Sequence, residues 1–319
     1  RHLQEVDLPI FHIGGWFDTY LRGTLHCYQD FAARSVYRQQ LLVGPWVHLP
    51  WSRKVGDVDF GPKAGNPIDG LQLQWFEQFL KGRDTQLLGE PPICLFEMGS
   101  HRWRNFNRWP SSNHQKSYFL SSTGLASIRE DAGTLIPEET ISIQNSFDIL
   151  VHDPWRPVPA LGGHAAIPAG SFERSHLDCR SDILTYTTEP LTADLHLAGD
   201  VAVEIWCTAD KPSHDLCAIL SEVHPNGNVY NLTQGYLHVE SSESRPLRLT
   251  LQATCARIAQ GNAIRLSLSA ACFPAYSMNP GTGKPNGCDR LMDAEIITLT
   301  VSCGSDRPSH VLLPVVSPS

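Results

Sequence analysis

Two kinds of hydrophobic pattern divide this chain of 319 residues. Within the first 85 residues, short apolar runs alternate with segments whose apolar residues recur at steps of three and four. Residues 8–13 and 40–44 have the length and character of buried strands, whereas residues 19–33 and 71–80 have the period of amphipathic helices. The order strand, helix, strand, loop, helix is typical of an α/β architecture with a parallel sheet.

The pattern changes at Pro91-Pro92. Beyond this point no helical period is evident, and short strands separated by turns recur. They are predicted at 93–99, 116–122, 194–209, 216–224, 247–258, 263–271 and 294–303. Short, regularly spaced strands of this kind favour a β-sandwich, here a jelly roll. We therefore predict an α/β part over residues 1–88 and a jelly-roll β-sandwich domain over residues 89–319.

Both predicted strands of the α/β part end in a glycine-tryptophan turn with a chemically useful residue. Gly15-Trp16-Phe17-Asp18 follows the first strand, and Gly44-Pro45-Trp46-Val47-His48 follows the second. One intervening helix makes the two strands adjacent and parallel, so their carboxyl ends meet at the same edge of the sheet. A carboxylate that orients an imidazole, which in turn activates a serine, is the machinery of acyl transfer. Asp18 and His48 are therefore the predicted acid and base of a triad whose order along the chain is Ser, Asp, His.

Each of these residues also has a structural interpretation. Asp18 could cap the helix that begins after it, and His48 could be an ordinary loop histidine. The matching turns at two strand ends favour the catalytic pair over both alternatives. Trp16, Tyr20 and Trp51 are candidates for an aromatic substrate-binding wall, with ordinary packing as the alternative.

The nucleophile is not evident in this sequence. No serine precedes Asp18, and Ser35 and Ser52 lack the Gly-x-Ser-x-Gly context of a nucleophile elbow. We expect the serine and the oxyanion hole to come from a segment N-terminal to these residues. Residues 1–85 alone cannot close a doubly wound sheet, so they are expected to need that segment or another copy of the chain, which leaves a homo-oligomer open. The chain by itself is expected to be inactive.

Charge and hydropathy exclude two classes of partner. The net charge of −8 argues against nucleic-acid binding, because such proteins need a basic surface. The basic stretch 102–108 is interleaved with aromatic residues and is interpreted as a hairpin surface. No apolar segment approaches the roughly 20 residues that cross a bilayer, so no membrane association is predicted.

The cysteines and histidines point to neither a cofactor nor a metal. The nine cysteines are scattered without Cys-x-x-Cys spacing, and no His-x-x-x-His pair is present. Most cysteines are expected to be small buried residues in a reducing compartment. We therefore expect a cytoplasmic protein, although secretion is left open because the true N-terminus is not visible.

The residues around Asp18 and His48 also carry a family resemblance. PIFHIGGWFDTYLRGTLHCY over 9–28, followed by LLVGPWVH over 41–48, resembles the Asp and His segments of the CocE/NonD hydrolases, a family that includes cocaine esterase, X-Pro dipeptidyl-peptidases and α-amino-acid ester hydrolases. The similarity continues through residues 75–82, 91–110, 153–163, 180–191 and 262–280. It implies the C-terminal part of an α/β-hydrolase domain followed by a jelly-roll domain that helps to close the active site.

The resemblance implies a serine hydrolase of ester or amide bonds that acts through a Ser-His-Asp acyl-enzyme mechanism. Its substrate would be a small-molecule ester or amide, or a short X-Pro peptide. The alternative is a non-catalytic β-sandwich binding protein that retains a vestigial part of a hydrolase.

Overall fold

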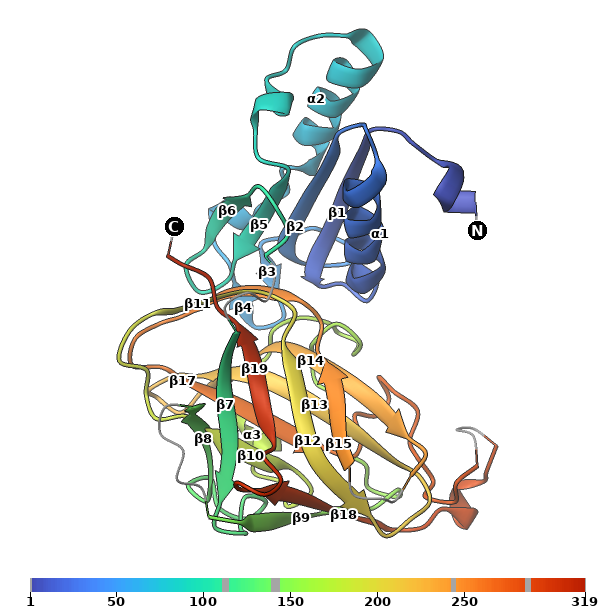
Figure 1. The fold of residues 1–319 in the computed structure, drawn as a ribbon, viewed down its shortest axis with the longest axis vertical. Coiled ribbons are helices and arrows are strands. Elements are labelled where there is room, and N and C mark those ends of the chain that lie inside the picture. Colours follow the sequence, from blue (N-terminus) through green and yellow to red (C-terminus); the bar gives the residue numbers. More distant parts are fainter. Residues whose placement is uncertain (1, 111–114, 139–143, 242–244, 285–287, 319) are drawn as a thin grey trace.

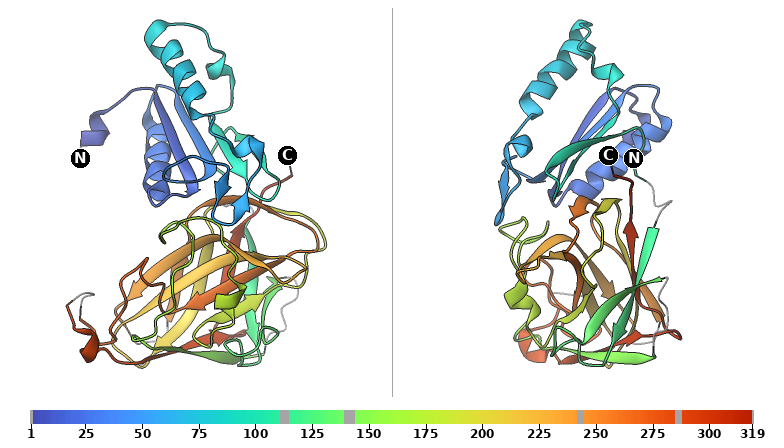
Figure 2. Two further views of the ribbon diagram at one scale, coloured as in Figure 1. Left: turned by 180° about the vertical axis from the view of Figure 1, so that it is seen from behind. Right: turned by 90° about the vertical axis from the view of Figure 1, so that its left-hand side faces the viewer.

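The computed structural model describes residues 2–110, 115–138, 144–241, 245–284 and 288–318. A small α/β part stands on one end of a larger β-sandwich (Figure 1), and two further views of the same arrangement are given in Figure 2. The predicted fold class, an α/β part followed by an all-β part, is confirmed. No helix among the described residues is long and apolar enough to span a membrane.

The sheet of the α/β part has four strands in the order β1-β2-β5-β6. Their bounds are Ile10–Phe17, Gln39–Val47, Ile93–Glu97 and Arg102–Phe106. Strands β1, β2 and β5 are parallel, whereas β6 returns antiparallel to β5. The sheet therefore extends past residue 88, and the predicted division there does not coincide with its end: residues 93–106 form a hairpin of the α/β sheet rather than strands of the sandwich.

The remaining elements of this part are two helices, a small hairpin and three short 3-10 turns. These are α1 (Leu21–Arg34), α2 (Ile68–Lys81), β3 (Lys54–Val55), β4 (Val58–Asp59), η1 (His2–Glu5), η2 (Pro62–Ala64) and η3 (Leu87–Gly89). Helix α1 buries the residues that its period predicted, namely Leu21, Leu25, Tyr28 and Phe31. It packs on β1 and β2, and its N-terminus directly follows the loop at the carboxyl end of β1.

Helix α2 is less well covered than its sequence predicted. It ends at Gly82, whose φ of 65° gives the left-handed C-cap that glycine adopts without a steric penalty. Trp75 is buried and stacks on Phe11 of β1 with ring centroids 5.6 Å apart. Phe76 and Leu80, which the helical period places on or near the same face, are 52% and 76% exposed.

The sandwich contains most of the strands. Their bounds are β7 Gln115–Ser122, β8 Gly133–Pro137, β9 Ser146–His152, β10 Leu184–Thr187, β11 Leu195–Gly199, β12 Ala202–Ala209, β13 His214–Val223, β14 Val229–Val239, β15 Arg245–Thr250, β16 Thr254–Ile258, β17 Ala263–Ser269, β18 Ile297–Cys303 and β19 His310–Pro314. Strands β14-β13-β17-β10-β8-β7-β19-β12-β18-β9 pair in that order, β15 pairs with β12, and β11 pairs with β16. A single helical turn, α3 (Ser175–Asp178), and the 3-10 turn η5 (Leu291–Asp293) complete it.

Two segments predicted as single strands are interrupted. Residues 194–209 divide at Gly199, whose φ is 120°, into β11 and β12. Residues 247–258 divide at residues 251–253 into β15 and β16. At the second break the chain meets the α/β part, where the Gln252 side chain contacts the end of β1 and the loop after it.

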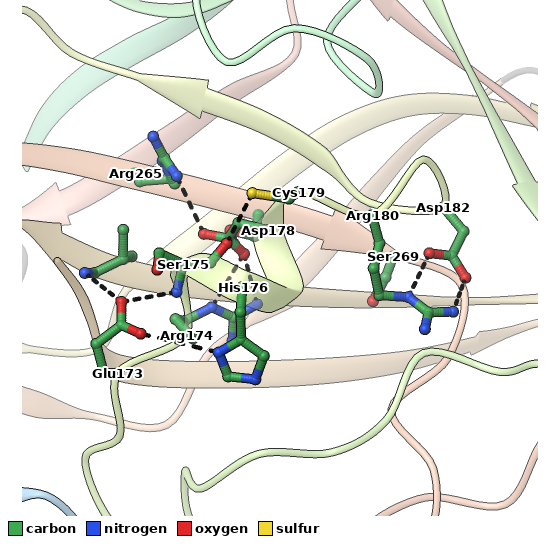
Figure 3. A network of polar contacts seen from close by, with 12 residues as sticks. Glu173, Arg174, Ser175, His176, Asp178, Cys179, Arg180, Asp182, Arg265 and Ser269 are labelled. Atoms are coloured by element: carbon green, nitrogen blue, oxygen red, sulfur yellow. Dashed lines mark hydrogen bonds and ion pairs between the residues drawn. The ribbon is translucent and has the colours of Figure 1, made fainter. Parts of the chain in front are cut away.

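A buried ionic cluster lies inside the sandwich. Figure 3 shows Arg174 and Arg265 directed at Asp178, whose side chain is fully buried. Asp178 Oδ1 accepts hydrogen bonds from Arg174 Nη2 at 2.9 Å and from Ser267 Oγ at 3.1 Å, and Arg265 Nη1 lies 3.4 Å from Oδ2. One carboxylate thus compensates two buried guanidinium groups.

A second buried cluster joins the two parts of the molecule. Glu97 of β5 accepts hydrogen bonds from Arg104 of β6 at 2.6 Å and from His196 of β11 at 2.8 Å. Burial alone would raise the pKa of Glu97, but the hydrogen bonds from His196, Ser100 and Arg104 together hold it below its ordinary value. Arg104 also donates to the Ser317 carbonyl, so the C-terminal segment returns to the α/β part.

Candidate active site

Asp18 lies in the loop between β1 and α1, as predicted from the position of the strand. Its side chain is 8% exposed. Oδ1 accepts a hydrogen bond from the Tyr20 backbone N–H at 2.8 Å, and the Asp18 carbonyl accepts one from Leu21 N–H at 3.1 Å. Asp18 thus lies two residues before the N-cap of the helix, which is Tyr20, and it is not itself the capping residue that the structural interpretation suggested.

The second carboxylate oxygen of Asp18 faces His48. Nδ1 of His48 lies 3.2 Å from Asp18 Oδ2, a distance at which the imidazole N–H donates to the carboxylate. His48 follows β2 directly, so the pair joins the carboxyl ends of two adjacent parallel strands. The His48 side chain is 60% exposed, and its Nε2 has no hydrogen-bond partner among the described residues.

Two glycines allow the turns that bring the pair together. A Cβ atom on Gly15 would lie 2.2 Å from the Trp46 carbonyl oxygen, and one on Gly44 would lie 2.3 Å from the Trp46 ring. The register between β1 and β2 also shifts between Gly15 and Phe17. Irregularities of this kind re-aim the residues that follow them, here Asp18.

The three aromatic candidates occupy different environments. Tyr20 is 64% exposed and packs edge-on against His48, with ring centroids 4.9 Å apart. Trp51 is half-buried against Trp46, and no interaction joins it to His48 among the described residues. Trp16 is 2% exposed, and its indole donates to the Phe96 carbonyl at 2.7 Å. This placement corrects the expectation that Trp16 binds substrate, because a buried indole offers no surface to a ligand.

The sandwich contributes contacts to this loop that the sequence did not indicate. Gln252, only 4% exposed, donates from Nε2 to the Trp16 carbonyl at 2.9 Å and to the Asp18 carbonyl at 3.2 Å. The Thr19 hydroxyl donates to the His164 carbonyl at 2.6 Å. Burial lowers the pKa of His164 to about 4, so its imidazole is neutral near pH 7. A glutamine inside the apolar run 247–258 was the available signal for Gln252.

No serine or cysteine among the described residues hydrogen-bonds to His48. Ser52, four residues away, donates to the Lys54 carbonyl instead. The cavity between α2 and the sheet, about 330 Å³ in volume, is lined by residues such as Phe11 and Leu42 and does not include the pair. The chain thus presents an oriented acid and base at an open surface.

An α/β sheet that carries an Asp–His pair at adjacent strand ends, joined to a β-sandwich, defines the class of this protein as hydrolase-like in architecture. Residues 87–312 match the X-Pro dipeptidyl-peptidase C-terminal non-catalytic domain, and residues 1–50 match the X-Pro dipeptidyl-peptidase (S15) family. The chain belongs to the first of these families, and the resemblance drawn from the sequence is confirmed.

Known proteins of this kind are longer. Cocaine esterase from Rhodococcus sp. (strain MB1 Bresler) is 27% identical over 335 residues, which cover 99% of this chain but 58% of that protein. The crystal structure of an aminopeptidase from a marine sediment Thaumarchaeota archaeon has a TM-score of 0.82 at 20% identity, over 98% of this chain and 55% of that one. An α-amino acid ester hydrolase has a TM-score of 0.80 at 22% identity, over 97% and 56%. The two structural matches establish the shared fold.

Proposed function

We propose that this chain is the C-terminal part of a serine hydrolase that cleaves ester or amide bonds. The observation that carries the proposal is the Asp18–His48 pair, with Nδ1 held by a buried carboxylate and Nε2 left open at the surface. Of the proposed triad only the serine is lacking, because the base is oriented and its reactive nitrogen is accessible to a serine hydroxyl that would donate its proton there. The family relationship and the similarity to cocaine esterase support the same reaction class.

In the proposed mechanism each atom of the pair has a role. Asp18 Oδ2 accepts the Nδ1 proton, which fixes the tautomer in which Nε2 of His48 carries a lone pair. Nε2 removes the proton of a serine hydroxyl as the serine oxygen bonds to the acyl carbon. The resulting imidazolium, stabilised by Asp18, gives that proton to the leaving alcohol or amine. Water then repeats the sequence, and the serine ester is hydrolysed to the free acid.

The serine is proposed to come from a segment outside these residues. Strand β1 pairs with β2 on one side only among the described residues, so its other edge presents unpaired backbone groups. A parallel strand added there would extend the sheet and bring its own carboxyl end beside Asp18 and His48. The matched relatives, of which the chain covers 55–58%, have the length for such a segment. A second copy of the chain is the other source to be tested.

The experiment compares the 319-residue chain with the product of the coding sequence extended upstream. We expect hydrolysis of p-nitrophenyl acyl esters and labelling by a fluorophosphonate probe only in the longer protein. In that protein D18N should lower kcat by up to about 10⁴-fold, the loss seen when a triad carboxylate no longer fixes the histidine tautomer. Labelling of the isolated chain at one of its own serines would contradict the proposal.

A second experiment addresses the class of substrate. Tyr20 lies against His48, and we propose that it contacts the acyl group, so Y20A should raise KM more than it lowers kcat. The named relatives suggest a panel of acyl esters, α-amino-acid esters and X-Pro amides. A longer protein that hydrolyses none of them, and contains no nucleophile elbow, would favour the non-catalytic binding protein instead.

A further inference from the structure

We propose that Gln252 of the sandwich is a positioning residue for Asp18, so that the sandwich takes part in setting the geometry of the acid–base pair. The inference rests on the proposed function of that pair. It concerns a residue 234 positions away from Asp18 along the chain, within the region that matches a domain described as non-catalytic.

The contact is made by one buried primary amide. Nε2 of Gln252 is 2.9 Å from the Trp16 carbonyl oxygen and 3.2 Å from the Asp18 carbonyl oxygen. These two carbonyls flank Phe17, at the place where the register of β1 against β2 shifts. An amide has two N–H groups, so a single side chain can hold both ends of this irregular segment.

Gln252 is itself held firmly. It lies in the break between β15 and β16, where its backbone N–H donates to the Gln234 carbonyl at 3.0 Å. Its backbone carbonyl accepts a hydrogen bond from the Thr233 hydroxyl. The side chain therefore projects from a fixed point of the sandwich, and it is 4% exposed.

Two neighbouring contacts join this loop and the first turn of α1 to the sandwich. The Thr19 hydroxyl donates to the His164 carbonyl at 2.6 Å, and Arg22 Nη2 donates to the Thr250 carbonyl at 2.9 Å. Both of these are at exposed residues, whereas the Gln252 contact is buried and cannot be replaced by water without a rearrangement. Of these three contacts, the loss of the one made by Gln252 would therefore most increase the mobility of the Asp18 backbone.

The consequence concerns the tautomer of His48. A carboxylate at Nδ1 favours the form protonated on that nitrogen, which leaves Nε2 free to accept a proton. If the Asp18 loop shifts, the 3.2 Å contact with Nδ1 weakens, and the imidazole populates the form protonated on Nε2. If the role of Gln252 were purely structural, its removal would lower stability without changing the ratio of the two His48 tautomers.

The test uses the full 319-residue chain and compares Q252M with Q39M. Gln39 is a matched control, because it is 5% exposed and its Nε2 donates to the Leu8 carbonyl at 2.8 Å, at the opposite end of the same pair of strands. Both changes remove one buried amide of the same size. Thermal unfolding reports the loss of stability, and long-range ¹H–¹⁵N correlation spectra of the imidazoles report the tautomer of His48.

We expect the two variants to lose comparable stability, while only Q252M converts His48 substantially to the Nε2-protonated form. An unchanged tautomer in Q252M would overturn the inference, as would an equal change in Q39M. If Q252M does not fold, Q252N keeps a polar side chain that is one methylene too short to span both carbonyls. The same tautomer change is expected there, and its absence is equally decisive.

An activity measurement separates this inference from the proposed function. In the longer protein Q252M should lower kcat by about 10- to 100-fold with KM changed less than about twofold, as expected when a catalytic group is misplaced by a fraction of its reach. An inactive wild-type longer protein would defeat the proposed function and leave the tautomer result standing. An active wild type with an equally active Q252M would defeat the inference alone.

Discussion

Replacement of Asp178 by asparagine is expected to destabilise the sandwich strongly. The change keeps the shape of the side chain but removes the one negative charge between Arg174 and Arg265 (Figure 3). Both arginines are also buried, at 2% and 5% exposure, so water cannot take over the compensation. The asparagine amide would also direct N–H groups toward one of the two guanidinium groups.

The magnitude follows from the burial of all three residues. Removing one partner of a buried ion pair costs about 3–5 kcal/mol, because the remaining charge is left uncompensated. For a sandwich of this size a urea m-value of about 3 kcal/mol per molar converts a loss of about 4 kcal/mol into a midpoint lower by about 1.3 M. The exposed pair Arg290–Asp293 provides the contrast, since water and salt screen such pairs and they add little to stability.

The assay is urea unfolding followed by circular dichroism, with D178N and D293N measured beside the wild type. We expect a midpoint decrease above about 1 M for D178N, by the same conversion, and a much smaller decrease for D293N. A D178N midpoint that matched D293N would show that the buried guanidinium groups are compensated in some other way, and would refute the reasoning.

Three further predictions concern acid stability, strand packing and the unpaired edge. Burial lowers the pKa of His214 to about 4, whereas the unfolded chain takes up this proton at about 6.5, so lowering the pH from 6.5 to 4 should reduce the free energy of unfolding by about 3 kcal/mol. H214L should therefore flatten the fall of Tm with decreasing pH, and a parallel decline in both proteins would be the contrary result. G15A should unfold the α/β part, because its Cβ would lie 2.2 Å from the Trp46 carbonyl oxygen. G70A in α2, where a Cβ would meet no atom within 4 Å apart from its chain neighbours and the backbone of its own helix, should instead stabilise by up to about 1 kcal/mol. Equal effects of the two changes on Tm would disprove the steric argument. Limited proteolysis of the monomer should remove residues 1–85 before the sandwich is cut, and resistance of that segment would show that its edge needs no partner.

Much of the fold followed from local patterns. The helical period of α1 and the apolar runs of β1 and β2 specified their elements, because burial of one face requires that spacing whatever the neighbours are. The hairpin β5–β6 lies beyond the predicted division at residue 88, yet it pairs with the α/β sheet. The strand propensity of its residues suits either sheet, and only the parallel pairing of β5 with β2 decides which sheet the hairpin joins.

The exposed face of α2 is a second case. Its apolar residues predicted burial, but in the described residues Phe76 and Leu80 remain exposed. A periodic pattern states that a helix has an apolar face, and it does not state which surface covers that face. The same reasoning applies to Trp16, whose position in the turn before Asp18 suggested a ligand contact while its indole faces the core.

The sequence by itself determined that an acid and a base stand at the ends of two adjacent parallel strands, because strand order and a single helical crossover fix that geometry. Tertiary structure alone decided that Nδ1 of His48 faces Asp18 Oδ2 at 3.2 Å, that Tyr20 packs on the imidazole and that Trp16 does not reach it. It also decided that Gln252 of the sandwich donates hydrogen bonds to the Trp16 and Asp18 carbonyls. Contacts between residues more than 200 positions apart leave no periodic signature along the chain, so they emerge only when the two parts pack together.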